Sequence, residues 1–241
     1  MKEPSLKEIN KLIEQLCYRF NRYEVLTDVF EVSALALSNQ FDKRREVWQR
    51  REEQYLKTIN KYNAEEQKTM AHVFALIFNL LSNVANSTSR DSFADYLGEL
   101  YMLSETSNAK TGQFFTPYHL SQACAAVSCD KDKLFNDLEK NGVILVNEPT
   151  CGSGGMVLAI ADVLWNKHQI NYTQDMLAIC SDIDARCVHM AYLQLGLTGV
   201  PAVIYNQNTL TLETWDEWHT PALCMQWLKL RRYIKAYEKK E

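Results

Sequence analysis

The segment NEPTCGSGGM, residues 147–156, decides the fold of this chain. It follows an apolar run, 143–147, that predicts a buried strand, and it leads into an apolar stretch, 155–167, that predicts a helix. Glycine tolerates backbone conformations that other residues disfavour, and it lets the backbone approach a ligand closely. The turn contains three such residues, Gly152, Gly154 and Gly155. The pattern therefore indicates either a tight strand-to-helix turn or a ligand-binding loop.

Downstream of this segment, predicted strands and helices alternate. Residues 176–181 read as a second strand, 184–195 as a helix that Gly196 ends, and 202–205 as a third strand. A later apolar run, 223–227, is a further strand candidate. Alternating strands and helices favour an α/β fold with a parallel, doubly wound, Rossmann-like sheet.

The glycine pattern argues against two common nucleotide-binding loops. The dinucleotide fingerprint would require glycine at position 157, which is Val157. A phosphate loop would require Gly-Lys-Ser/Thr, which the turn lacks. A nicotinamide-dependent oxidoreductase is therefore disfavoured.

The first ninety residues have a different, all-helical character. Apolar residues recur at three- and four-residue spacing in 6–20 and again in 70–84, while 42–62 is highly charged and reads as a solvated helix with internal ion pairs. The small, polar run 83–92 is a candidate linker. We expect a helical N-terminal domain, 1–90, followed by an α/β domain, 91–241.

Composition limits the cellular setting and the partners. The 241-residue chain has a formal net charge of −4, so a nucleic-acid substrate would need phosphate contacts from a partner or from one local basic patch. Its seven cysteines form no C-x-x-C pair, which argues against a zinc site and suits reduced thiols in a cytoplasm. The N-terminus has no apolar signal core, and 70–84 is too short for a membrane span, so we expect a buried helix there.

Two further segments flank the glycine turn. Upstream, TGQFFTP covers 111–117, and Thr116-Pro117 reads as the capped start of a helix. Downstream, CSDID covers 180–184 at the end of the second strand. There Asp182 can accept hydrogen bonds from the ribose hydroxyls of a nucleoside ligand, whereas Asp184 is the better candidate for capping the next helix.

Together these segments resemble adenine-N6 DNA methyltransferases, and in particular the M (modification) subunit of type I restriction-modification systems. The matching pieces, spread over about 91–212, are LGELY, GQFFTP, EPTCGSGG, SDID and QNTL, at 97–101, 112–117, 148–155, 181–184 and 207–210. The two blocks around the glycine turn and at 112–117 are specific, and the others are weak alone.

The resemblance implies S-adenosylmethionine as the cofactor and assigns residues to each of its parts. The methionine end would be lined by Phe115, Thr116 and Pro117. The amino acid group would be surrounded by Glu148, Cys151, Gly152 and Gly154. The ribose would be held by Asp182 and the adenine ring by Ile183. Asn208, also assigned to the cofactor, would lie near the adenine amino group, to which it can present its carbonyl oxygen.

One element of the family pattern is absent. The family's catalytic motif, [DNS]-P-P-[YFW], orients the target amine and stacks on a base flipped out of the duplex. The prolines here, at 4, 117, 149, 201 and 221, are never adjacent, and the nearest element is Thr220-Pro221. Asn208 and Thr220 are therefore the remaining catalytic candidates, and only four strands can be argued where a complete sheet of this class has about seven.

Two functions from different classes follow. The first is an adenine-N6 DNA methyltransferase that works on DNA with a specificity partner or a second subunit. The second is a catalytically inactive S-adenosylmethionine-binding protein of the same descent, with a regulatory or structural role. In either case we expect the N-terminal helices to serve assembly with a second copy or another subunit.

Overall fold

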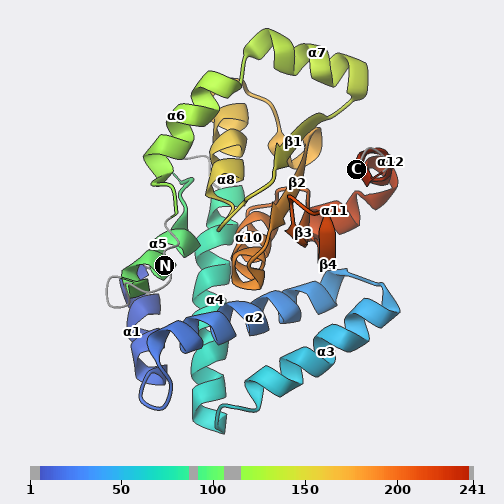
Figure 1. Cartoon of the computed structure of the whole chain (residues 1–241). Coiled ribbons are helices and arrows are strands. Elements are labelled where there is room, and N and C mark those ends of the chain that lie inside the picture. The colour runs from blue at the N-terminus through green and yellow to red at the C-terminus, as the bar shows by residue number, and fades with distance from the viewer. Residues whose placement is uncertain (1–5, 87–91, 106–114, 239–241) are drawn as a thin grey trace.

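The N-terminal third of the chain is helical. The computed structural model describes residues 6–86, 92–105 and 115–238. The first helices are α1 (Leu6–Leu16), α2 (Arg22–Phe41), α3 (Arg45–Ile59) and α4 (Ala64–Asn86) (Figure 1). The helical prediction is thus confirmed for the described residues. Helix α4 extends into the predicted linker, whose positions 87–91 lie outside them.

The α/β part begins with three further helices and alternates from there. Its helices are α5 (Tyr96–Glu105), α6 (Tyr118–Ser128), α7 (Lys131–Asn141), α8 (Gly155–Asp162), α9 (Tyr172–Asp175), α10 (Ala185–Leu197), α11 (Pro221–Met225) and α12 (Trp227–Glu238), with a π-helical turn, η1 (Val163–Lys167), after α8. Its strands are β1 (Ile144–Glu148), β2 (Met176–Asp182), β3 (Ala202–Asn208) and β4 (Glu213–His219).

Within the described residues, the four strands form one sheet in the order β1-β2-β3-β4. The first three are parallel, as predicted, and β4 runs antiparallel to β3. One face packs against α8 and α10, and the other packs against α12 through Leu230 and Ile234. The parallel strands therefore end together at one edge, where their carboxyl ends can build a site.

Three details differ from the sequence prediction. Gly196 lies inside α10 and does not end it; a Cβ there would meet Pro221 Cδ at 3.1 Å, so this glycine permits a close approach to α11. Residues 223–227 are helical rather than a strand, because Pro221 at the first position starts α11. Pro117 is the cap residue of α6 and not its first helical residue, and no side-chain hydrogen bond caps this helix.

Helix α10 lies at the centre of the core. Its positions from Cys187 to Leu197 are all buried, between the sheet on one side and α2 on the other. One continuous cluster of buried apolar side chains runs from Ile9 in α1 to Trp218 in β4. The N-terminal helices thus form the outer layer over one face of the α/β sandwich.

The charged segment 42–62 does not behave as a fully solvated helix. Arg51 is 1% exposed, and its guanidinium lies 3.8 Å from the centroid of the Trp218 ring. It donates to the carbonyl oxygen of Glu217 at 2.9 Å and pairs with Asp42 at 3.3 Å. The interpretation as a solvated face is wrong for Arg51, because α3 packs against β4, a strand that lies far away in the sequence.

Helix α4 is amphipathic. Its buried side is formed by Met70, Val73, Ile77, Leu81 and Val84, which repeat every three or four residues. Length and hydropathy alone would allow Ala64–Ala85 to cross a membrane, and 28% of the apolar window is buried inside the protein. The predicted buried helix is therefore present with one face only in the core.

The buried imidazole of His189 predicts a pH dependence of stability. His189 in α10 packs edge-on against Trp218 at 5.1 Å, and burial lowers its pKa from 6.5 to about 4. Between these two pH values the unfolded chain binds a proton that the folded chain does not, so stability falls as the pH falls from 6.5 towards 4. The shift corresponds to at most about 3 kcal/mol.

We expect His189→Gln to remove this contribution. Urea denaturation of both proteins between pH 7 and pH 4 measures it. The wild type should lose stability more steeply on acidification than the variant, and parallel pH profiles would contradict the assignment to His189.

Candidate functional site

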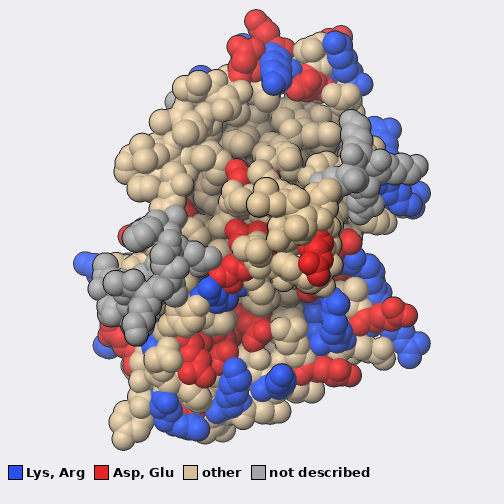
Figure 2. Space-filling view, in the orientation of Figure 1, with Lys and Arg blue, Asp and Glu red and all other residues tan. Residues whose placement is uncertain are grey.

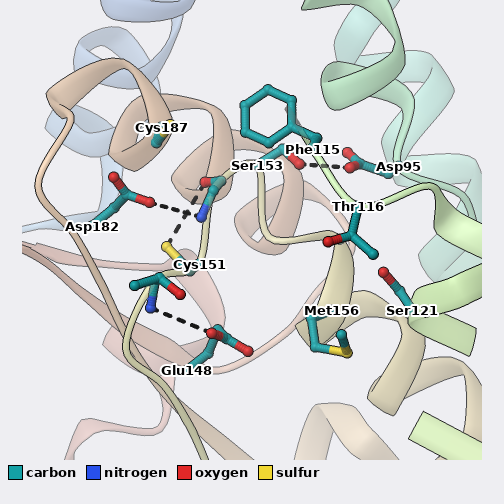
Figure 3. Close-up of a pocket in the computed structure, with 13 residues that line it drawn as sticks. Asp95, Phe115, Thr116, Ser121, Glu148, Cys151, Ser153, Met156, Asp182 and Cys187 are labelled. Atoms are coloured by element: carbon teal, nitrogen blue, oxygen red, sulfur yellow. Dashed lines mark hydrogen bonds between the residues drawn. The ribbon is translucent and has the colours of Figure 1, made fainter. Parts of the chain in front are cut away.

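A cavity of about 450 Å³ opens at the carboxyl ends of β1 and β2 (Figure 3). Its size suits a small-molecule ligand. The walls come from the glycine turn, the end of β2, and the segments that precede α5 and α6. The lining residues are Asp95, Phe115, Thr116, Ser121, Glu148, Thr150, Cys151, Gly152, Ser153, Gly155, Met156, Asp182 and Cys187.

The glycine turn has the backbone conformations that its sequence predicts. Gly152 has φ +53° and Gly154 has φ +90°, both in the left-handed region. A Cβ at Gly152 would meet the Phe115 ring at 3.0 Å. The N–H of Cys151 donates to the carbonyl oxygen of Ser181 at 2.8 Å, which ties the turn to β2. The turn and the end of β2 are thus held together as one wall.

Three carboxylates line the cavity, and two of them, Glu148 and Asp182, are the last residues of β1 and β2. Asp182 accepts hydrogen bonds from the N–H of Gly152 and the N–H of Asp184, both at 2.9 Å. Burial raises the pKa of Asp182, and burial likewise raises the pKa of Glu148, which accepts from the N–H of Thr150 at 3.3 Å. Acidic oxygens at this place can accept hydrogen bonds from hydroxyl or ammonium groups of a ligand.

The expectation for Asp184 is confirmed. Asp184 is the cap residue of α10, and its carboxylate accepts from the N–H of Arg186 at 2.9 Å. The two acids of the SDID segment therefore have different roles: Asp182 lines the cavity, and Asp184 caps α10.

Sequence reasoning missed the polar group behind the glycine turn. Asp95 is buried; it accepts from the Ser153 hydroxyl at 2.6 Å and from the Gln194 amide at 2.8 Å. A Cβ on Gly98 or Gly155 would meet the Asp95 carboxylate at 2.3 or 2.7 Å. The glycines of both motifs therefore make room for Asp95, and their joint occurrence was the available signal for a shared partner.

Cys151 packs inside the turn and does not act as a nucleophile in this setting. Its neighbour Cys180 and burial raise the pKa of the Cys151 thiol well above its usual value of 9.0. A thiol that stays protonated at neutral pH is a poor nucleophile. Cys151 does line the cavity, and its buried side chain contributes packing there.

The other predicted residues do not line the cavity. Pro117 is the N-cap residue of α6, Gly154 is the N-cap residue of α8, and Ile183 follows Asp182 with 61% of its surface exposed. Asn208 ends β3, and its side-chain oxygen accepts from the N–H groups of Leu210 and Thr211 at 3.0 and 3.3 Å. Because that oxygen already accepts two backbone hydrogen bonds, accepting one from an adenine amino group would require the turn at residues 208–211 to change conformation.

Thr220 is not part of the site, which corrects the second catalytic candidate. It is 0% exposed, and its hydroxyl donates to the carbonyl oxygen of Val200 at 2.8 Å and accepts from the N–H of Ala202 at 2.9 Å. Ala202 is the first residue of β3, so Thr220 lies at the amino ends of the parallel strands, opposite the cavity. Its role is to hold the end of β4 to the start of β3.

The cavity fits a nucleoside that carries an amino acid group. A glycine turn without space for a Cβ at Gly152, a carboxylate at the end of β2 and the ring of Phe115 surround it. A carboxylate in this position of a doubly wound sheet suits ribose hydroxyls, and Glu148 supplies a second acceptor near the turn. Asp182 and Glu148 are thus acceptors for the ribose hydroxyls and the ammonium group of S-adenosylmethionine.

The comparison with protein families agrees with this class. A family model described as N-6 DNA methylase matches residues 88–225. A solved structure described as a class I S-adenosylmethionine-dependent methyltransferase from Listeria monocytogenes has a TM-score of 0.48 and 14% identity. The similarity covers 85% of this chain and 54% of that chain, so this chain spans about half of its length. No curated protein matches the sequence.

The fold is of the class found in S-adenosylmethionine-dependent methyltransferases, and S-adenosylmethionine is the cofactor that the matched family implies. The family match extends over more than half of the sequence. The chain therefore belongs to the N-6 DNA methylase family.

We expect Gly152→Val to abolish measurable cofactor binding while the protein stays folded. The new side chain would meet the Phe115 ring, and a β-branched residue would strain the backbone at the positive φ of this position. Calorimetric titration with S-adenosylmethionine measures the loss. Gly199→Ala is the matched control, because Gly199 also has a positive φ (+79°) but does not line the cavity. Wild-type affinity in Gly152→Val would contradict the site.

Proposed function

We propose that this chain is the cofactor-binding part of an adenine-N6 DNA methyltransferase, similar to the M subunit of type I restriction-modification systems. The observation that carries the proposal is the cavity at the ends of β1 and β2, with Asp182 and the glycine turn joined in one of its walls. Membership of the N-6 DNA methylase family supports adenine in DNA as the acceptor.

The reaction would be a direct transfer. When bound, S-adenosylmethionine supplies an electrophilic methyl group on a sulfonium centre. Transfer of this methyl group to the adenine amino group would leave N6-methyladenine and S-adenosylhomocysteine, with one proton released to water. In this step Asp182 and Glu148 would hold the donor in place, and Phe115 would exclude water beside the turn.

Surface charge supports a partner for DNA binding. On the face in Figure 2, Lys and Arg side chains are interspersed with Asp and Glu, and the formal net charge is −4. A protein that neutralises many phosphates on its own usually presents a basic surface. We therefore assign most phosphate contacts and sequence recognition to a specificity or second subunit.

A second candidate function is an inactive cofactor-binding subunit with a regulatory or structural role. One observation favours it: Thr220 lies away from the cavity, and the Asn208 oxygen is engaged in its own turn. Neither catalytic candidate presents a free acceptor to the cavity.

A methyl-transfer assay decides between the two. The purified chain is incubated with tritiated S-adenosylmethionine and unmethylated DNA, and incorporation into adenine is measured. Gly152→Val serves as the cofactor-deficient control. Transfer by the wild type, alone or with a partner subunit, supports the enzyme; cofactor binding without transfer under both conditions favours the inactive subunit. Absence of cofactor binding would refute both.

A further inference from the structure

Positive charge is concentrated at the C-terminal end of the sequence. Residues 227–241 contain six Lys or Arg and two Glu, whereas the other 226 residues contain twenty Lys or Arg and twenty-eight Asp or Glu. The formal net charge of −4 is therefore the sum of a strongly acidic body and a basic segment. Such an asymmetry is typical of a segment that contacts an anionic partner.

Helix α12 presents this positive charge on one side. Its other side is buried against the sheet through Leu230 and Ile234. The outward stripe repeats at the spacing of a helix face and consists of the exposed residues Leu228, Arg231, Arg232 and Lys235. From 227 to 237 the helix contains no Asp or Glu. Figure 2 shows Lys and Arg side chains gathered at the upper right, where Figure 1 places α12.

The arginines of the stripe have no carboxylate partner in the described part of the chain. The ranges 6–86, 92–105 and 115–238 contain nine arginines, and six of them pair with an Asp or Glu. The other three are Arg45, Arg231 and Arg232. Arg232 contacts the ring and hydroxyl of Tyr233, which leaves its charge uncompensated.

Two structural explanations do not account for the stripe. A solvated helix with internal ion pairs mixes both signs of charge, as α3 does with its glutamates at 46, 52 and 53. A favourable interaction with the helix dipole explains only cations in the last turn, and Lys235 is the residue of the stripe that lies there. Arg231 and Arg232 therefore remain available to an anion from outside the chain.

Helix α12 leads towards the cofactor cavity. At its start, the Trp227 ring stacks on His219 with centroids 4.9 Å apart, and His219 pairs with Val203 near the amino end of β3. At its other end, the Tyr237 hydroxyl donates to the Asn147 side chain at 3.3 Å, and the next residue, Glu148, lines the cavity. The stripe therefore runs from the amino ends of the parallel strands towards the edge where the cavity opens.

Two more exposed cations adjoin the start of α12. Lys43 and Trp227 line the same recess, of about 280 Å³, and Arg45 begins α3 beside it. We call Lys43, Arg45, Arg231, Arg232 and Lys235 the basic surface. From 231 to 235 the helix rises about 6 Å, which matches the spacing of two neighbouring phosphates in one DNA strand, about 3.4 Å apart along the axis.

We propose that the basic surface binds the phosphate backbone of double-stranded DNA and holds the duplex beside the cofactor cavity. This inference rests on the proposed function, and it assigns to this chain its own share of the phosphate contacts. Guanidinium and ammonium groups donate charge-assisted hydrogen bonds to phosphate oxygens. Contacts of this kind position a duplex without reading its sequence, so recognition of the sequence stays with a second subunit.

The test is the affinity of the full chain for a fluorescein-labelled duplex of about 20 base pairs, measured by fluorescence anisotropy between about 50 and 200 mM salt. The variant replaces Arg231, Arg232 and Lys235 together by Ala. We expect it to bind at least about tenfold more weakly at the lower salt concentration. Its slope of log affinity against log salt should fall by about 2–3, because each lost phosphate contact removes about 0.9 from the slope.

Two further variants separate the basic surface from net charge and from folding. The matched control replaces Lys7, Lys11 and Lys57 by Ala, which removes the same number of exposed positive charges from α1 and α3. It should keep the wild-type slope. Arg231→Lys/Arg232→Lys keeps the charge of the stripe and should also keep that slope. Thermal unfolding of all variants checks that α12 stays folded, as the high helix propensity of Ala and Lys leads us to expect.

Calorimetry with S-adenosylmethionine on all proteins tests the proposed function separately. Normal cofactor binding, with equal duplex affinity in the α12 variant and the wild type, would overturn the basic surface and leave the proposed function standing. An equal loss in both triple-Ala variants would also overturn it, as an effect of net charge alone. If vesicles with phosphatidylserine bind through the stripe and the duplex does not, the partner is a lipid surface and DNA is refuted. Stripe-dependent duplex binding without cofactor binding would support the basic surface and refute the proposed function.

Discussion

Asp182→Ala is expected to weaken S-adenosylmethionine binding at least about 100-fold, because hydrogen bonds to charged groups contribute roughly 1.5–3 kcal/mol each and a ribose offers two hydroxyls. The loss of affinity should exceed that from removing the ribose hydrogen bonds alone, because Asp182 also accepts from the N–H groups of Gly152 and Asp184 and so holds the glycine turn in place. Asp182→Asn keeps one acceptor oxygen and should bind with intermediate affinity.

Isothermal titration calorimetry measures these affinities. Asp130→Ala is the matched control: Asp130 caps α7 by accepting from Lys133 N–H at 2.9 Å, and it does not line the cavity. It should lose roughly 1 kcal/mol of stability at most and no cofactor affinity. Equal affinity in Asp182→Ala and wild type would remove Asp182 from the site.

Arg51→Ala is expected to lower the free energy of unfolding by about 3–5 kcal/mol, because it removes a buried partner from an ion-pair network and leaves Arg44 as the remaining cation beside Asp42. Here Asp42 and the Glu217 carbonyl would lose a donor, and Trp218 would lose the guanidinium over its ring. Burial of Asp42 opposes its ionisation, yet hydrogen bonds from Arg44 keep its pKa below the usual value, so it stays charged at neutral pH.

Arg50→Ala provides the comparison within the same helix. Arg50 also pairs with Asp216, but its side chain is 54% exposed, and an exposed pair contributes at most about 1 kcal/mol. Urea unfolding of both variants at pH 7 gives the two values. A loss for Arg51→Ala no larger than for Arg50→Ala would show that the α3–β4 contact contributes little.

The parallel part of the sheet was predictable from sequence because its signals are local. Short apolar runs predicted β1, β2 and β3, and the SDID segment predicted that Asp184 rather than Asp182 caps the next helix. The glycine turn also identified most of one cavity wall. Such motifs allow local structure to be predicted, because the backbone geometry of each segment requires particular residue types at particular positions.

What could not be predicted depends on contacts between distant segments. Asp95 reaches the turn at Ser153 across 58 positions, and Arg51 reaches Glu217 across 166. No periodicity in either segment encodes its partner. Thr220 was misplaced for a related reason: its distance from Asn208 along the chain is short, but the antiparallel course of β4 carries it to the far end of the sheet.

The continuous core that joins α1 to β4 makes the folding of the chain cooperative. Helix α10 has no solvent-facing side from Cys187 to Leu197. Detaching α2 would therefore expose the buried side chains of α10 to water. The two halves should consequently melt in a single transition. Binding energy gained at the cavity should then appear as slower amide exchange in the N-terminal helices, far from any atom that touches the ligand.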